Sequence, residues 1–273
     1  ILCGNQPMTR SCDGRSCTIV YNGEIYNTDE IIPELNKNGY VLSTTSDTEV
    51  ILYAYMHYGA DFVEKLNGIF AIAIWDDALQ KLFLFRDRVG VKPLFYATRN
   101  DTLIFGSEPK ACFVHPDFEP EIDKQGLQEL LSIGPAHTSG TTLFKGLYEV
   151  LPGHYISYSK EGLYDEKYWD IVSHEHTDDY ARTVEHTRYL VEDSIIRQMV
   201  SDVPVCTFLS GGIDSSIVTA VAADYLNRNG KTLNTFSFDF KDNDKYFKSN
   251  SFQPERDLPY VNRMLEEYET AHS

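Results

Sequence analysis

A short stretch between residues 203 and 240 constrains the fold of this chain more than any other feature. Apolar runs at 203–209 and 233–240 flank a glycine-rich turn and an apolar helical segment at 214–227. Two strands joined through a helix over so short a stretch form a βαβ unit, because parallel strands need a crossover connection of this kind. The second half of the chain is therefore predicted to be an α/β domain with a parallel sheet.

The turn inside this unit predicts a phosphate site. It holds two glycines and three serines in seven positions. Glycines let the backbone approach an anion closely, and the following helix N-terminus offers unpaired N–H groups and the positive end of the helix dipole. The alternative is an ordinary turn in which a Ser or Asp side chain caps the helix. The candidate phosphate-binding residues are Ser210, Gly211, Gly212, Asp214, Ser215 and Ser216.

The first half of the chain has a different pattern. Between residues 18 and 111, short apolar runs of strand length are separated by turn residues. Helices are predicted at 29–38, 48–58 and 123–132 from their apolar spacing and their capping residues. A polar segment without strand periodicity follows at 170–179, and we expect a domain boundary there. The first half is therefore predicted to be a sheet-rich domain.

Composition excludes several classes of protein. The 273 residues include 24 Lys and Arg against 41 Asp and Glu, which gives a net charge of −17. A chain this acidic does not fit a general nucleic-acid or anionic-membrane binder, since both need a basic surface. The longest apolar stretch, residues 68–75, has the length of a strand rather than of a membrane span. Five irregularly spaced cysteines indicate neither a disulfide framework nor a zinc ribbon, so we expect a soluble cytoplasmic protein.

Motifs in both halves resemble known families. The turn Ser-Gly-Gly-Ile-Asp-Ser at 210–215 resembles the pyrophosphate-binding loop of N-type ATP pyrophosphatases. Four segments of the first half together resemble the class II glutamine amidotransferase domain. They are Tyr-Asn-Gly-Glu-Ile-Tyr-Asn at 21–27, Ser-Asp-Thr-Glu-Val at 46–50, Phe-Arg-Asp-Arg-Val-Gly-Val-Lys-Pro-Leu at 85–94 and Gly-Ser-Glu-Pro-Lys at 106–110. The order of the motifs is similar to that of the glutamine-hydrolysing asparagine synthetase family.

The resemblance implies a fold for each half. Residues 1–172 would form an α+β, Ntn-type αββα glutaminase domain without its N-terminal part. Residues 179–273 would form an incomplete α/β parallel-sheet ATP pyrophosphatase domain without its C-terminal part. The chain begins without Met and ends directly after a helix-like segment, so we expect a fragment that is itself inactive.

The resemblance also implies a glutamine site. Asn22 and Gly23 match the residues whose side-chain amide and backbone N–H form the oxyanion hole. Glu24 and Asp47 match positions that bind glutamine, with Asp47 facing the α-ammonium group. By itself, Asn22-Gly23 is typical of a hairpin turn. The nucleophile of the family is an N-terminal cysteine that we expect to be absent from this chain, and Cys3 is interpreted as an ordinary thiol.

For the second half, the resemblance implies an ATP site. Leu209 and Phe238 match positions that contact the adenosine part of ATP, and Asp214 is expected near Mg²⁺. The implied activity is ATP-dependent asparagine synthesis from aspartate, with ammonia from glutamine attacking a β-aspartyl-AMP intermediate. The expected partners are the small molecules glutamine, aspartate and ATP, and we expect the protein to bind neither nucleic acid nor membranes. Whether it forms a homodimer is left open. The alternatives are a related enzyme that adenylates another carboxylate, and an inert fragment that only binds ATP or glutamine.

Overall fold

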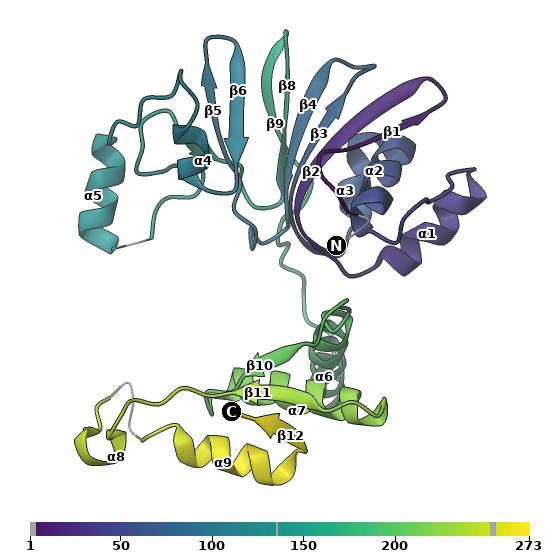
Figure 1. Ribbon diagram of the computed structural model, residues 1–273. Coiled ribbons are helices and arrows are strands. Elements are labelled where there is room, and N and C mark those ends of the chain that lie inside the picture. The colour runs from purple at the N-terminus through teal and green to yellow at the C-terminus, as the bar shows by residue number, and fades with distance from the viewer. Residues whose placement is uncertain (1–3, 135, 252–254) are drawn as a thin grey trace. The chain divides into compact units, whose positions relative to one another are not determined.

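The computed structural model describes residues 4–134, 136–251 and 255–273. The chain divides into two compact units, Ile1–Ser173 and His174–Ser273 (Figure 1). Among the described residues, no helix is long and apolar enough to cross a membrane.

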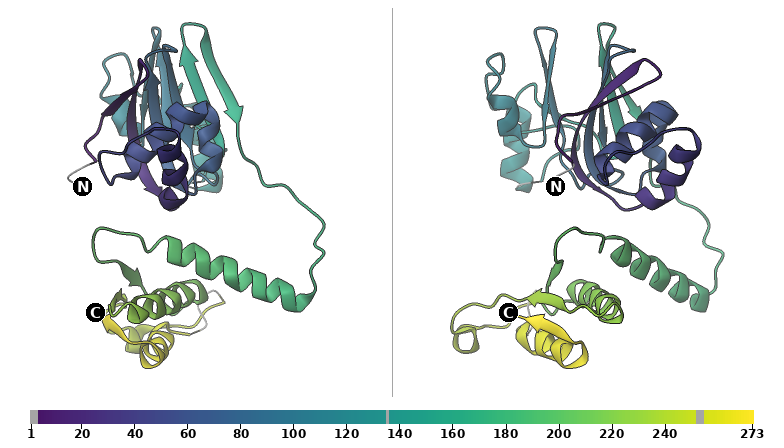
Figure 2. Two further views of the ribbon diagram at one scale, coloured as in Figure 1. Left: turned by 90° about the vertical axis from the view of Figure 1, so that its right-hand side faces the viewer. Right: turned by 45° about the vertical axis from the view of Figure 1, so that its right-hand side comes forward.

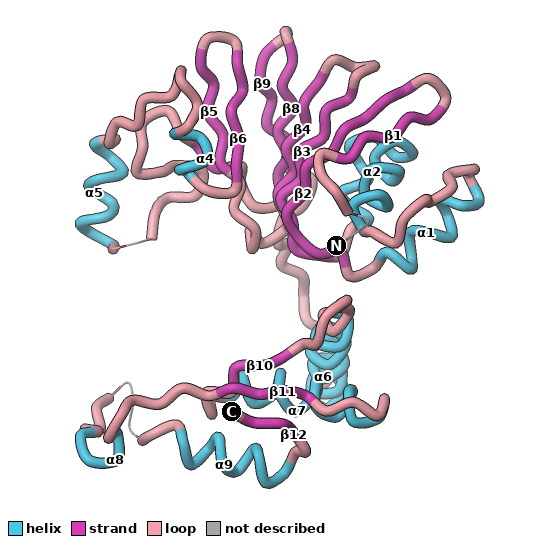
Figure 3. The backbone as a smooth tube through the Cα atoms, viewed as in Figure 1, coloured by secondary structure: helices cyan, strands magenta, loops and turns pink. Residues whose placement is uncertain are grey.

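The first unit contains two antiparallel sheets (Figure 3). The larger has the strand order β1-β2-β3-β4-β8-β9 and the smaller has the order β6-β5-β7. The strands are β1 (Met8–Cys12), β2 (Arg15–Ile25), β3 (Gly68–Asp76), β4 (Lys81–Arg86), β5 (Phe95–Arg99), β6 (Thr102–Gly106), β7 (Tyr148–Glu149), β8 (His154–Ser159) and β9 (Gly162–Lys167).

Helices cover the outer faces of the two sheets. They are α1 (Thr28–Lys37), α2 (Asp47–Tyr58), the 3₁₀ turn η1 (Gly59–Asp61), α3 (Phe62–Lys65), α4 (Pro109–Phe113) and α5 (Lys124–Ile133). Helices α1 to α3 lie on one face of the larger sheet, and α4 and α5 lie on the side of the smaller sheet (Figures 1 and 2). The four layers confirm the αββα architecture expected for the first half.

The alternation of side chains along β3 shows how the sequence specifies these layers. Phe70, Ile72 and Ile74 point into the core shared with the helices α1 to α3. Ala71 and Ala73 point the other way, into a core shared with the smaller sheet. Successive side chains of a strand face opposite sides of its sheet, so one apolar run supplies two cores.

The hairpin-turn interpretation of Asn22-Gly23 is wrong, because both residues lie inside β2. Gly23 pairs with Phe70 of β3 along a continuous antiparallel ladder. A Cβ atom on Gly23 would lie 2.1 Å from the carbonyl oxygen of Ile69. The glycine therefore permits a close approach of two strands and does not form a turn.

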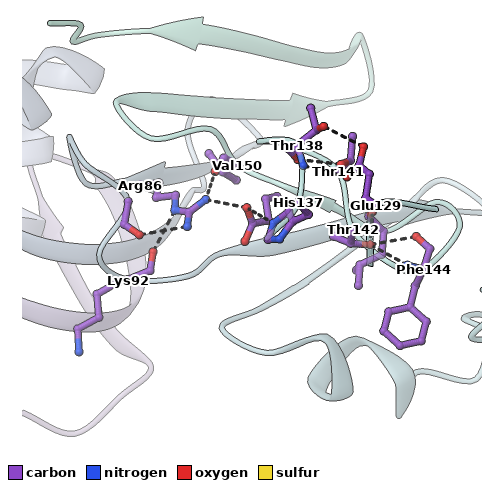
Figure 4. Close-up of polar contacts among 12 residues, drawn as sticks. Arg86, Lys92, Glu129, His137, Thr138, Thr141, Thr142, Phe144 and Val150 are labelled. Atoms are coloured by element: carbon purple, nitrogen blue, oxygen red, sulfur yellow. Dashed lines mark hydrogen bonds and ion pairs between the residues drawn. The ribbon is translucent and has the colours of Figure 1, made fainter. Parts of the chain in front are cut away.

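The turn after β4 is held by buried charged groups. The Arg86 guanidinium donates to the carbonyl oxygens of Lys92 at 3.1 Å and Val150 at 2.7 Å (Figure 4). It also pairs with Glu149 at 3.3 Å, and the same carboxylate lies 3.3 Å from the ring of His137. Arg86 thereby fixes the segment that follows β4 to the segment that precedes β8.

The second unit has a parallel sheet with the order β10-β11-β12. Its elements are α6 (Tyr180–Arg197), β10 (Cys206–Phe208), α7 (Ile213–Arg228), β11 (Leu233–Phe236), α8 (Asn243–Tyr246), α9 (Leu258–Glu267) and β12 (Thr270–His272). This confirms the predicted βαβ unit and parallel sheet. The two predicted strands are shorter than expected, and β12 is a strand that the sequence pattern did not predict.

Candidate active sites

The open edge of β2 carries a row of backbone N–H groups. Strand β1 pairs with β2 only as far as Met8 opposite Ile19. Beyond that point, the N–H of Tyr21 donates to the side chain of Gln6 at 2.5 Å, and the N–H of Ile25 lies 3.4 Å from the Asp47 carboxylate. Gly23 lies between these two residues, and alternate residues of a strand direct their N–H groups to the same edge.

The hydrogen bonds of Phe70 show that the N–H of Gly23 also points to this edge. Phe70 is the residue opposite Gly23, but its own N–H and carbonyl groups bond to Asp87, at 3.2 and 2.9 Å. Gly23 and Phe70 are therefore a non-hydrogen-bonded pair. Within the described part of the chain, no acceptor is recorded for the N–H of Gly23. A fixed donor of this kind is what an oxyanion hole requires.

The side chain of Asn22 lies on the face of the larger sheet that also carries Ala71, its partner on β3. It is exposed, and its Nδ2 atom donates to the hydroxyl of Ser107 at 3.1 Å. The second hydrogen of the amide group stays available for a ligand. Glu24 is exposed and points to the same face of β2, two residues further along.

Asp47 reaches β2 from the start of α2. Its Oδ2 atom accepts a hydrogen bond from the Tyr21 hydroxyl at 2.8 Å. Burial raises the pKa of Tyr21 well above its ordinary value of 10, and the neighbouring Asp47 carboxylate raises it further, so Tyr21 stays a neutral donor. Among the described residues, no hydrogen bond to Oδ1 is recorded. Asp47 is therefore held beside the predicted oxyanion hole with one oxygen left for a cation.

The loop that leads to Asp47 is fixed by a buried carboxylate. Glu49 accepts hydrogen bonds from the backbone N–H groups of Ser43 at 3.0 Å and Thr44 at 2.7 Å, and from both of their hydroxyls. Burial alone would raise the pKa of Glu49, but hydrogen bonds from Ser43, Arg10 and Thr44 outweigh it and hold the pKa at about 2. The charged carboxylate thus orders the loop that precedes α2.

The N-terminal segment lies against the same loop. A Cβ atom on Gly4 would lie 3.1 Å from the hydroxyl of Ser46, the N-cap residue of α2. Gln6 lies at the edge of β2, as described above. Cys3 lies outside the described residues, so the prediction that it is an ordinary thiol stays a prediction.

The predicted phosphate turn joins β10 to α7. Gly211 has a φ of +79°, a left-handed conformation that favours glycine. Gly212 is the N-cap of α7, and none of the described side chains caps the helix. The hydroxyls of Ser210 and Ser215 bond to each other at 3.0 Å, and the Ser215 hydroxyl also donates to the carbonyl of Gly212 at 3.1 Å. The alternative of a side-chain-capped turn is therefore wrong, because within the part of the chain that the structure describes no side chain caps the first turn of α7.

A cavity of about 270 Å³ opens beside this turn, at the carboxyl ends of β10 and β11. Ligands of open α/β sheets bind at this edge. Phe238 lines the cavity and is 81% exposed, whereas Leu209 lines it from a buried position. Ser210 also lines the cavity, so three of the predicted ATP-site residues meet there.

Asp214 lies in the first turn of α7 and is exposed. Among the described residues, no group of three or more His, Cys, Asp or Glu side chains gathers into a cation site. Magnesium bound to a nucleotide needs only one or two protein carboxylates, because phosphates and water supply the remaining oxygens. The chemistry of the single Asp214 carboxylate at the phosphate turn therefore fits magnesium.

Sequence reasoning assigned no role to several residues that the structure brings to these sites. Ser107 lies in the motif at 106–110, but only the tertiary structure shows its contact with Asn22. His272 bonds through its two ring nitrogens to the hydroxyls of Thr235 at 2.9 Å and Ser237 at 3.1 Å, and Ser237 lines the cavity. No local pattern could have identified either contact, because the partners lie far apart in the sequence.

Comparisons with known proteins assign a family to each half of the chain. Residues 2–169 match the glutamine amidotransferase domain family, and residues 186–273 match the asparagine synthase family. Asparagine synthetase [glutamine-hydrolyzing] 3 of Bacillus subtilis is 47% identical over 270 residues, which are 98% of this chain and 44% of that protein. Asparagine synthetase [glutamine-hydrolyzing] 1 of the same organism is 37% identical, over 87% of this chain and 37% of that protein.

Among solved structures, the B. subtilis glutamine phosphoribosylpyrophosphate amidotransferase complexed with ADP and GMP is 19% identical and covers 93% of this chain and 52% of that one. Its TM-score of 0.43 is too low to bear on the fold. The chain spans less than half the length of the two curated relatives named above. It belongs to the glutamine amidotransferase domain family and joins that domain to an asparagine synthase segment, which confirms the resemblance seen in its motifs.

Proposed function

We propose that the protein makes asparagine from aspartate and ATP with glutamine as the nitrogen donor. The observation that carries this proposal is the presence, in one chain, of two features. Among the described residues, the N–H of Gly23 beside Asn22 has no acceptor, and the glycine turn at the edge of the parallel sheet has no side-chain cap. The first suits a developing oxyanion and the second suits phosphate oxygens. The names of the curated relatives describe the same pairing of glutamine hydrolysis with asparagine synthesis.

In the glutaminase half, Asn22 and Gly23 stabilise the negative charge that forms on the carboxamide oxygen of glutamine. Asp47 binds the α-ammonium group of glutamine through the oxygen that Tyr21 leaves free. Glu24 contacts the substrate from the same face of β2 as Asn22. Hydrolysis of the carboxamide releases glutamate and ammonia.

In the synthetase half, the turn at 210–216 binds the phosphates of ATP, and Leu209 and Phe238 contact its adenosine part. The β-carboxylate of aspartate displaces pyrophosphate to form β-aspartyl-AMP. Ammonia then displaces AMP and forms asparagine. Magnesium, held by Asp214, would screen the phosphate charges. The homodimer and the cytoplasmic location stay predictions.

An activity assay of the full protein that contains these residues tests the proposal. We expect asparagine, glutamate, AMP and pyrophosphate to form in equal amounts from aspartate, ATP and glutamine. Asn22→Ala should lower glutamine-dependent synthesis by at least about 100-fold, the usual effect of losing an oxyanion donor, and leave ammonia-dependent synthesis unchanged. Equal loss of both activities would contradict the assignment of two separate sites.

The same assay separates the alternatives. Pyrophosphate release that depends on a different carboxylic acid, with none from aspartate, would identify a related adenylating enzyme. Binding of ATP or glutamine without any product would identify a binding module.

A further inference from the structure

The exposed side chain of Asn22 has a partner that the proposed reaction does not use, the hydroxyl of Ser107. The two residues lie 85 positions apart and come from different sheets, with Asn22 in β2 and Ser107 directly after β6. We infer that Ser107 is a positioning residue, which holds the carboxamide of Asn22 in the orientation that stabilises the oxyanion. This inference rests on the proposed glutaminase function.

The carboxamide of Asn22 needs such a partner because its orientation is not otherwise determined. The last torsion of an Asn side chain has broad preferences, and an exposed amide rotates freely among them. An oxyanion hole lowers the barrier only when its donors are already in place, since reorientation during the reaction costs free energy. The hydrogen bond to Ser107, 3.1 Å long, uses one hydrogen of Nδ2 and leaves the other for the substrate.

Ser107 itself is held rigidly. Gly106, the last residue of β6, pairs with Phe95 of β5. A Cβ atom on Gly106 would lie 2.8 Å from the Cβ atom of Ala111 in α4, so the strand end packs tightly against that helix. Helix α4 begins with Pro109, two residues after Ser107, which restricts the backbone further. The smaller sheet thus supplies a fixed anchor for a side chain of the larger sheet.

The inference is tested by steady-state kinetics of glutamine hydrolysis in the full protein. Ser107→Ala should lower kcat by about 10-fold or more, less than the loss of the donor itself, while KM for glutamine changes by less than about 3-fold. Ser107→Thr keeps the hydroxyl and should restore most of the activity. Ser11→Ala is the matched control, because it breaks a similar exposed hydrogen bond between two side chains, from the Ser11 hydroxyl to the Ser16 hydroxyl at 3.3 Å on the β1–β2 hairpin. This variant should change neither kcat nor KM.

A double variant shows whether Ser107 acts through Asn22. If it does, Asn22→Ala combined with Ser107→Ala should be no slower than Asn22→Ala alone. The inference would be overturned if the fold-loss of kcat in the double variant equalled the product of the two single losses, or if Ser107→Ala left kcat unchanged. Either result would leave the proposed function intact. A wild-type protein that never hydrolyses glutamine would overturn both. Tryptophan fluorescence during urea unfolding checks that each variant folds.

Discussion

Glu49→Gln removes a negative charge from a buried position and leaves the size of the side chain unchanged. The Glu49 carboxylate is fully buried and accepts hydrogen bonds from Arg10, Ser43 and Thr44. Both oxygens of the Glu49 carboxylate accept hydrogen bonds in the wild type, whereas a Gln amide has only one acceptor oxygen. The NH₂ group of the variant must therefore face donors that the second carboxylate oxygen satisfies in the wild type. We expect the loop at 43–46 to loosen and the first unit to lose stability.

The size of the loss follows from the pKa. The hydrogen bonds hold the pKa of Glu49 at about 2, against an ordinary value of 4.5. Each pKa unit corresponds to about 1.4 kcal/mol, so the charged form stabilises the folded state by about 3 kcal/mol relative to the neutral form. A lowered folded-state pKa means that this contribution is complete above pH 4.5 and is lost as the pH falls towards 2.

Urea unfolding followed by tryptophan fluorescence measures this difference in the whole chain. Both tryptophans of the chain, Trp75 and Trp169, belong to the first unit, so their emission reports on that unit. At pH 7 the variant should be about 3 kcal/mol less stable than the wild type, and the gap should narrow as the pH is lowered from 4.5 towards 3. Glu161→Gln, at an exposed position, is the control and should change stability by less than about 0.5 kcal/mol.

Two results would refute the reasoning. A gap below about 1 kcal/mol at pH 7 would mean that the charge of Glu49 contributes little. A gap of the same size at pH 7 and at pH 3 would mean that the loss comes from altered packing and not from the charge.

Further predictions concern the glycines. Gly23→Ala should destabilise the first unit by about 2 kcal/mol or more, since its Cβ atom would lie 2.1 Å from a backbone oxygen of β3; an unchanged urea midpoint would contradict this. Gly211→Ala should weaken ATP binding at least about 10-fold in calorimetry, because it places a Cβ atom 2.8 Å from the carbonyl of Asp257 at a φ of +79°. Gly230→Ala is the control, because Gly230 follows the C-terminus of α7 and has a similar φ of +67° away from the turn. Equal ATP affinities of the two variants would argue against the turn as the phosphate site.

Much of the fold could be predicted from patterns of neighbouring residues. The apolar run of β3 and the residues that cap α2, Ser46 before it and Gly59 after it, are properties of neighbouring residues, so they can be recognised without any partner. The glycine turn at 210–216 was also predictable, because strand, turn and helix follow one another directly in the chain. Strand β12 was not, since three residues carry no period and only the pairing with β11 makes them a strand.

The site at β2 depended on distant contacts. Asn-Gly favours a turn locally, but the register with β3 places Gly23 opposite Phe70 inside a strand. The direction of the Gly23 N–H depends on that register, and its availability depends on the point at which β1 stops pairing. The contact between Asn22 and Ser107 depends on how two sheets pack.

The sequence by itself determined the two kinds of domain, their order and the residues of the candidate sites. The tertiary structure decided which of those residues meet, which donors stay free and which neighbours hold them. The physical reason is the range of the interactions. Backbone propensity and side-chain period act within a few residues, whereas strand register and sheet packing join residues tens of positions apart.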